Sequence, residues 1–337
     1  MALGLSKRKA CALLFWGAPV LLIHLVDYCC QVWAAEHGDG PMQDLQMLEL
    51  FSGEQELTRQ CRLNGIECRA MDIRKDKVLH DLTSSRGFCL ALLRLLRVQP
   101  NGMIWGGNPC ASWVWISAST TKRRSREHGI FGDEGLEGVR VANCLAARFA
   151  LLAMVAIVNG VWWSVEQPSS SCLPKCPYVA HVMTNMAPTW YLRTWMGAFN
   201  HFCSKPTALF GSWPLLEELK CRLSQAEQKS LRESSAGMYT KKRLPDGRVR
   251  VTGGKRLKES GAYTPEFGKR VAQLFKKGAV SASHLAAQRQ RSLWKLEGPK
   301  GFEQPLDWKH ADLPALRQFL LEEIAANRFH PQPGLPL

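Results

Sequence analysis

Cys110 and Glu166 are the residues of this chain whose types and positions best suit chemistry. Cys110 closes the tetrapeptide Gly107–Cys110, which follows the apolar stretch Met103–Trp105. Glu166 directly follows a second apolar stretch, Val161–Val165. A cysteine supplies a nucleophile, and a glutamate supplies or accepts a proton. The pair predicts covalent catalysis with acid–base assistance, whereas Cys110 taken alone also suits a buried thiol on a loop.

The elements that must position these residues are apolar strands that alternate with helices. Strands are expected over 45–51, 66–71, 103–106 and 161–165, and helices over 54–64, 84–98 and 136–158. Such alternation is typical of a parallel sheet covered by helices on both faces. In open α/β sheets, ligands bind outside the carboxyl ends of the strands. We therefore predict an α/β fold in which Cys110 and Glu166 meet at that edge.

A glycine turn and two aspartates accompany the pair. The first strand ends in Phe51-Ser52-Gly53, and a glycine turn before a helix lets backbone amides approach a ligand. Asp72 ends the next strand, where an acidic residue can accept hydrogen bonds from a ribose. The alternative for Asp72 is a solvated carboxylate at a strand end. Asp81 is a further candidate acceptor.

The chain is strongly basic. Its 337 residues carry a formal charge of +15, and residues 1–40 contribute none of it, because three basic residues there balance three acidic ones. The excess favours a polyanionic partner, such as nucleic acid or an anionic membrane. The alternative is a basic soluble surface without such a partner. A hydrophobic fraction of 46% indicates a globular protein rather than a disordered one.

Two segments hold the candidate nucleic-acid contacts. The polar loop 117–132 follows Cys110, and the segment 239–258 has eight Lys or Arg against one Asp. We expect the loop to lower the pKa of Cys110 and both segments to bind phosphates. Aromatic residues over 190–213 suit base stacking or, alternatively, core packing. The candidate contacts are Arg123, Arg124, Arg126, Lys241, Lys242, Arg243, Arg248, Arg250 and Lys255.

The order and spacing of these motifs resemble the DNA cytosine-5 methyltransferase family over roughly residues 45–168. The resemblance implies an α/β, Rossmann-like S-adenosylmethionine-dependent methyltransferase sheet with helices on both faces, plus a small irregular basic recognition region. It implies S-adenosylmethionine as cofactor and nucleic acid as partner, DNA being favoured over RNA. By this resemblance, Phe51, Ser52 and Gly53 line the cofactor, Asp72 holds its ribose and Asp81 its adenine.

The resemblance also assigns the reaction. Cys110 would attack C6 of a flipped cytosine, Pro109 would shape the loop, and Glu166 would contact N3. Carbon 5 of cytosine is a poor nucleophile until a thiolate adds to the ring, and the base must leave the helix to reach the thiolate. The chain departs from the family pattern at Ala111 and Gln167, where the family usually has Gln and Asn.

Two other functions remain open at this point. One is a catalytically inactive nucleic-acid-binding module that keeps the fold without turnover. The other is a membrane-anchored methyltransferase with another substrate, which the N-terminus favours and the basic body opposes.

The first 40 residues have the layout of a targeting segment. Lys7-Arg8-Lys9 precedes an apolar run over 10–26, and Val32-Trp33-Ala34 resembles a cleavage site. A signal or anchor would place the protein in a membrane or the secretory pathway, with membrane attachment through 10–26. An organelle presequence, or a start at Met42 or Met47, would place it in an organelle or the nucleus. On each of these interpretations the segment lies outside the fold.

The remaining predictions concern domains and cysteines. No CxxC pair occurs among the twelve cysteines, so we predict a reducing compartment and no metal site. The predicted parts are a targeting segment and linker (1–40), a catalytic core (41–168), an aromatic and basic recognition region (169–260), a returning core helix (261–280) and a C-terminal tail (281–337).

Overall fold

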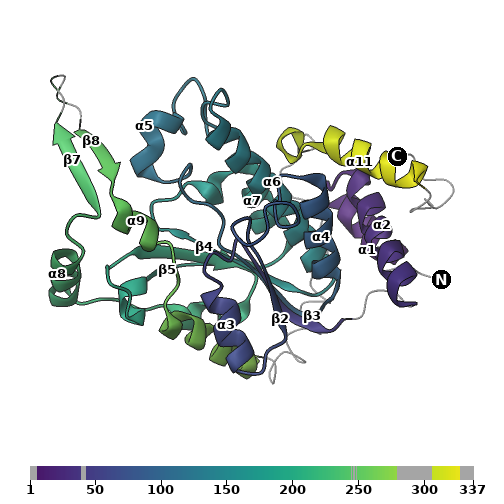
Figure 1. Ribbon diagram of the computed structural model, residues 1–337, viewed down its shortest axis with the longest axis horizontal. Coiled ribbons are helices and arrows are strands. Elements are labelled where there is room, and N and C mark those ends of the chain that lie inside the picture. Colours follow the sequence, from purple (N-terminus) through teal and green to yellow (C-terminus); the bar gives the residue numbers. More distant parts are fainter. Residues whose placement is uncertain are drawn as a thin grey trace.

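The protein is a mixed α/β structure with a mostly parallel central sheet flanked by helices (Figure 1). The computed structural model describes residues 6–38, 43–243, 245, 247, 249–278 and 306–326. The strands are β1 (Leu45–Leu50), β2 (Cys68–Met71), β3 (Val98–Gly106), β4 (Trp162–Pro168), β5 (Trp190–Trp195) and β6 (Pro206–Gly211).

The six-stranded sheet has the order β2-β1-β3-β4-β6-β5. Strands β1 to β4 pair in parallel, and β6 pairs antiparallel with both β4 and β5. The predicted strands over 45–51, 66–71, 103–106 and 161–165 are therefore all present and adjacent. Parallel neighbours place the ends of β1, β3 and β4 at one edge of the sheet, as expected.

Helices cover both faces of the sheet because successive strand residues point in opposite directions. Met47, Met103 and Trp105 belong to the hydrophobic cluster beside α3, whereas Leu48 and Ile104 belong to the cluster beside α4 and α6. The helices are α1 (Lys7–Phe15), α2 (Val20–His37), α3 (Glu56–Leu63), α4 (Ser85–Leu96), α5 (Ala118–Thr121), α6 (Glu137–Val158), α7 (Pro177–His181), α8 (Gln225–Ser234), α9 (Lys255–Glu259), a helix over 265–278, and α11 (Leu313–Ala325).

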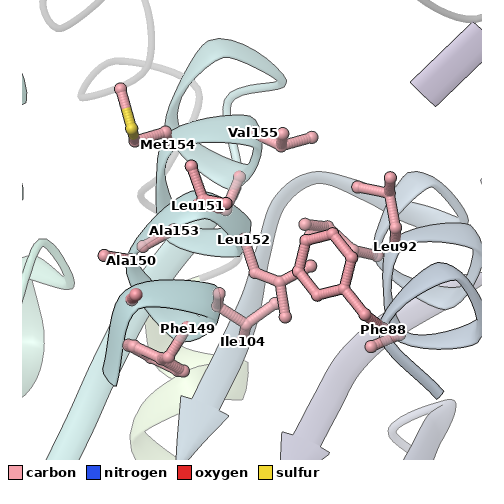
Figure 2. Close-up of a cluster of buried hydrophobic side chains, with 14 of the residues drawn as sticks. Phe88, Leu92, Ile104, Phe149, Ala150, Leu151, Leu152, Ala153, Met154 and Val155 are labelled. Carbon is pink, nitrogen blue, oxygen red and sulfur yellow. The ribbon is translucent and has the colours of Figure 1, made fainter. Parts of the chain in front are cut away.

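The apolar helix α6 is a core helix. Figure 2 shows Phe149 and Leu152 of α6 packed with Ile104 of β3 and Phe88 of α4. Among the described residues, α6 alone is long and apolar enough to cross a membrane, and 78% of its most apolar window is buried inside the protein. Its apolarity follows from contact with the sheet on one side and with α4 and α7 on others.

The prediction that the N-terminal segment lies outside the fold is wrong for residues 6–38. Helix α2 packs against α4 and α11, and its Leu22, Leu25 and Val26 are buried (Figure 1). Burial of such side chains stabilises a fold by about 1.5–3 kcal/mol each. The apolar run therefore serves packing, and its use in targeting stays a prediction.

The C-terminal segment 306–326 forms hydrogen bonds both to the N-terminal segment that holds α1 and α2 and to the core. Trp308 Nε1 donates to the carbonyl of Gly17 at 2.8 Å, and Tyr28 Oη donates to Glu323 at 2.9 Å. The Tyr178 hydroxyl lies 2.6 Å from His310 Nδ1. Within the predicted tail, α11 is a helix, whereas 281–305 and 327–337 lie outside the described residues.

A two-stranded hairpin stands apart from the central sheet. Strands β7 (Tyr239–Arg243) and β8 (Val249–Gly253) pair antiparallel and form the projection at the left of Figure 1. Before the hairpin the chain forms a short 3-10 helix, Pro214–Leu219, and then α8 as a separate helix. The break occurs because Ser224 and Glu227 form a reciprocal capping box that starts a new helix.

Candidate active site

The ends of β1, β3 and β4 bring the predicted turn, thiol and carboxylate together. Leu50 pairs with Gly106, and Gly106 pairs with Val165, so Phe51, Gly107 and Glu166 lie at one level. Phe51 and Gly107 follow the last residues of their strands, whereas Glu166 still lies within β4 and pairs with Leu209 of β6. The amide of Gly107 donates to the carbonyl of Leu50 at 3.0 Å. The register therefore joins the glycine turn to the cysteine loop.

Cys110 is a partly exposed thiol in the electrostatic field of Glu166. Burial raises its pKa first, the charge of Glu166 raises it further, and Lys205 opposes this change. The prediction that the basic loop would lower this pKa is wrong, because the cation that acts on Cys110 is Lys205. The resting thiol is held protonated, and removing charge from Glu166 would ease its ionisation.

Lys205 is a site residue that the sequence did not reveal. Its Nζ lies 3.4 Å from Glu166 Oε1, and the side chains are 12% and 9% exposed. Antiparallel β6 begins at the edge of the sheet where β4 ends, which places Lys205, the residue before β6, next to Glu166. A buried carboxylate needs such a partner, since an uncompensated charge inside a protein is costly.

The glycine turn after β1 contacts Asp72 at the end of β2. The Gly53 amide donates to Asp72 Oδ2 at 2.7 Å, and the Arg74 amide donates to Asp72 Oδ1 at 2.8 Å. Arg74 also forms ion pairs with Glu54 at 3.0 Å and with Asp72 at 3.3 Å. Gly53 has φ of +55°, and a Cβ there would lie 2.6 Å from Arg74 Nη2, so the position favours glycine.

Asp81 lies beside this turn but is engaged locally. His80 Nδ1 accepts from the Asp72 amide at 3.4 Å, which brings the His80-Asp81 pair to the end of β2. Asp81 Oδ1 accepts from the Thr83 amide at 2.9 Å and from its hydroxyl at 2.6 Å. Its role at an adenine stays a prediction.

Gln167 shapes the loop that carries the thiol. Its Nε2 donates to the Asn108 carbonyl at 2.6 Å, and its Oε1 accepts from the Ser171 hydroxyl at 2.9 Å. Gln167, where the resemblance would place Asn, therefore uses its side-chain amide to hold the cysteine loop in place. Pro109, next in the loop, is exposed.

Ser52 Oγ and Asn108 Oδ1 are buried at this edge without a hydrogen-bond partner among the described residues, and Glu166 Oε1 has its ion pair with Lys205 but no hydrogen bond there. Buried polar groups normally find partners, so orphaned ones at a strand edge suit a bound ligand. They follow β1 and β3 or lie near the end of β4, the three strands that carry the predicted site.

No protein-family model matches the chain, and no curated protein matches it. Within the described parts of the chain, no group of three or more His, Cys, Asp or Glu is arranged to hold a metal ion.

The basic residues divide between the surface and the interior. Arg123 is buried, stacks over Trp113 at 3.4 Å, and donates to Ser112 and Asn143. Its expected phosphate contact is therefore corrected to a structural role within the loop. Exposed basic residues are Arg124, Arg126, Lys242 and Arg243. Arg248 and the side chains of Lys241, Arg250 and Lys255 lie outside the described residues.

Glu49 is a second site-edge residue that the sequence did not single out. It lies on β1, fully buried, and its Oε2 accepts from the Thr58 amide at 2.9 Å and hydroxyl at 2.6 Å. Burial, the leading cause, raises its pKa from 4.5 to about 7. The position of this glutamate within an apolar strand could have indicated a buried carboxylate from the sequence alone.

Glu49→Gln is expected to flatten the pH dependence of stability. The folded protein binds the Glu49 proton more tightly than the unfolded chain does. The contribution of this proton to the free energy of unfolding is therefore fully present below about pH 4.5 and is lost as pH rises through about 7. The loss amounts to roughly 3 kcal/mol at most. Urea unfolding at pH 5 and pH 8 measures it, with exposed Glu233→Gln as control. An unchanged slope in Glu49→Gln would contradict this assignment.

Proposed function

We propose that the protein is an S-adenosylmethionine-dependent methyltransferase that transfers a methyl group to C5 of cytosine in DNA through a covalent adduct with Cys110. The observation that carries the proposal is the meeting of Cys110, Glu166 and Lys205 at the sheet edge, beside the turn in which Gly53 binds Asp72. Four parallel strands with helices on both faces, and a site at their carboxyl ends, support a Rossmann-like sheet.

The residues present fit the cofactor. The Asp72 carboxylate is oriented by the Gly53 amide for ribose hydroxyls, and the unpartnered Ser52 hydroxyl and Asn108 side-chain amide oxygen offer further polar contacts. When bound, S-adenosylmethionine supplies an electrophilic methyl group. Arg74 covers the turn and contacts Asp72, so its side chain must share this carboxylate with the ribose or move aside.

The chain's own residues then act on the base. The Cys110 thiol passes its proton to the Glu166 carboxylate, which shares it with N3 of cytosine as the sulfur bonds to C6 and the ring is activated. Lys205 fixes the Glu166 carboxyl and offsets its charge beside the thiol. After the methyl group is on C5, a water molecule takes the C5 proton. The Cys110 sulfur then leaves C6 and recovers its proton from N3 through Glu166, which restores the aromatic ring.

The exposed basic residues support a nucleic-acid substrate. Arg124 and Arg126 lie on the loop that follows the cysteine, and Lys242 and Arg243 lie on the hairpin. Trp115, 56% exposed and five residues after Cys110, offers an aromatic face near the thiol. Basic groups bind phosphates and aromatic rings stack on exposed bases.

Trapping with DNA that contains 5-fluorocytosine tests the proposal. Fluorine at C5 blocks the final elimination, so the wild-type protein with S-adenosylmethionine should form a covalent complex visible on a denaturing gel. Cys110→Ser should abolish it, and Cys221→Ser, which changes another partly buried thiol, should retain it. DNA binding without any adduct would overturn the enzymatic proposal and favour the inactive nucleic-acid-binding module.

A further inference from the structure

Tyr263 presents a hydroxyl proton that has no acceptor among the described residues. Its oxygen accepts a hydrogen bond from Trp105 Nε1 at 3.1 Å, which leaves the O–H free to donate. The side chain is partly buried and packs its ring against Trp105 and Phe267. A donor in such surroundings is costly unless something accepts from it.

The hydroxyl lies where the glycine turn meets the cysteine loop. A Cβ built on Gly107 would lie 3.2 Å from the Tyr263 oxygen and 2.9 Å from the carbonyl oxygen of Phe51. Gly107 therefore opens the space between these two oxygens. Charges at Glu166, Glu49 and Cys110 act on Tyr263 and, together with burial as the leading cause, raise its pKa, so the group stays a protonated donor.

The strand order shows which part of a ligand passes this point. Asp72 follows β2, and Phe51 follows β1. Gly107 and Cys110 follow β3, and Glu166 lies on β4, the fourth strand in this order across the sheet. Strands are about 4.8 Å apart, so the path from β2 to β4 spans roughly 14 Å. A cofactor with its ribose at Asp72 and its methyl group at Cys110 would have its sulfur between them, beside the ends of β1 and β3, and its amino-acid chain branches from that sulfur.

We propose that Tyr263 is a cofactor-binding residue whose hydroxyl donates a hydrogen bond to the carboxylate of the amino-acid part of S-adenosylmethionine. This inference rests on the proposed function. In that part of the cofactor the sulfonium and the ammonium groups accept no hydrogen bond, which leaves the carboxylate as the acceptor. Lys205, whose Nζ lies 5.9 Å from the Tyr263 ring centre, adds a positive charge nearby.

The experiment compares two ligands that differ in the part in question. S-adenosylhomocysteine retains the amino-acid chain, whereas 5′-methylthioadenosine lacks it. Calorimetry should show that Tyr263→Phe, which removes the hydroxyl and keeps the ring, weakens binding of S-adenosylhomocysteine about 10-fold, since a hydrogen bond to a charged group is lost. Binding of 5′-methylthioadenosine should be unchanged, as should both affinities in the control Tyr239→Phe on the exposed hairpin.

Three results would overturn the inference. Equal weakening of both ligands would show that Tyr263 acts by packing rather than through the amino-acid group. Unchanged affinity for both would show that the hydroxyl does not contact the cofactor, and the proposed methyltransferase would stand. Failure of the wild-type protein to bind either ligand would remove the cofactor site, and the proposed function with it.

Discussion

Lys205→Met is expected to lower the free energy of unfolding by about 3 kcal/mol, because removing one partner of a buried ion pair leaves the other charge uncompensated. Glu166 and Lys205 are both about nine-tenths buried, and Oε1 of Glu166 has no hydrogen bond among the described residues to replace the lost ammonium group. Urea unfolding at pH 7.5 measures the change. Lys220→Met, at an exposed lysine, serves as control.

A double variant separates this electrostatic loss from a loss of packing. In Lys205→Met with Glu166→Gln, the buried carboxylate becomes a neutral amide, so most of the lost stability should return. A double-mutant cycle gives the coupling energy between the two side chains. A single-variant loss below about 1 kcal/mol, the range of exposed pairs, or a coupling energy near zero would show that the pair is not structurally important.

Glu166→Gln is expected to move thiol reactivity and turnover in opposite directions. The Glu166 charge raises the pKa of Cys110, so its removal lowers that pKa and increases the thiolate fraction at neutral pH. Alkylation of Cys110 by iodoacetamide at pH 7.5 should therefore be faster than in the wild-type protein. Methyl transfer to cytosine should fall about 100-fold or more, because the proton at N3 loses its acidic partner.

The control for this variant is Glu127→Gln, which removes an exposed carboxylate from the neighbouring basic loop. Both alkylation and turnover should stay at wild-type values there. Slower alkylation in Glu166→Gln would mean that Glu166 assists ionisation of the thiol. Unchanged turnover would remove Glu166 from the proposed mechanism.

The core strands and the glycine turn could be predicted from the sequence because they depend on local signals. Apolar runs ending in turn residues located β1, β3 and β4. The sequence placed Gly53 and Asp72 at the ends of two strands, and the parallel pairing of β1 with β2 brings them into contact. These features need only the periodicity of a strand and the geometry of a parallel sheet.

Other parts of the site depend on long-range pairing that no local pattern shows. Lys205 reaches Glu166 because β6 pairs antiparallel with β4. The sequence around Lys205 does not indicate whether the strand that follows it runs parallel or antiparallel to its neighbour. Arg123 resembled the other arginines of its loop, but Trp113 and Asn143 give it buried partners. Tyr263 comes to Trp105 from a segment 158 residues further along the chain.

The packing of α2 against α11 has a consequence for protein synthesis. The two helices are separated by about 275 residues, so at 5–20 residues per second α2 is made roughly 14 to 55 s before α11. Helix α4 is available earlier and can cover one side of α2, but the side that meets α11 must wait. During translation the nascent chain therefore carries an exposed apolar helix for tens of seconds, a surface on which a ribosome-associated chaperone would act.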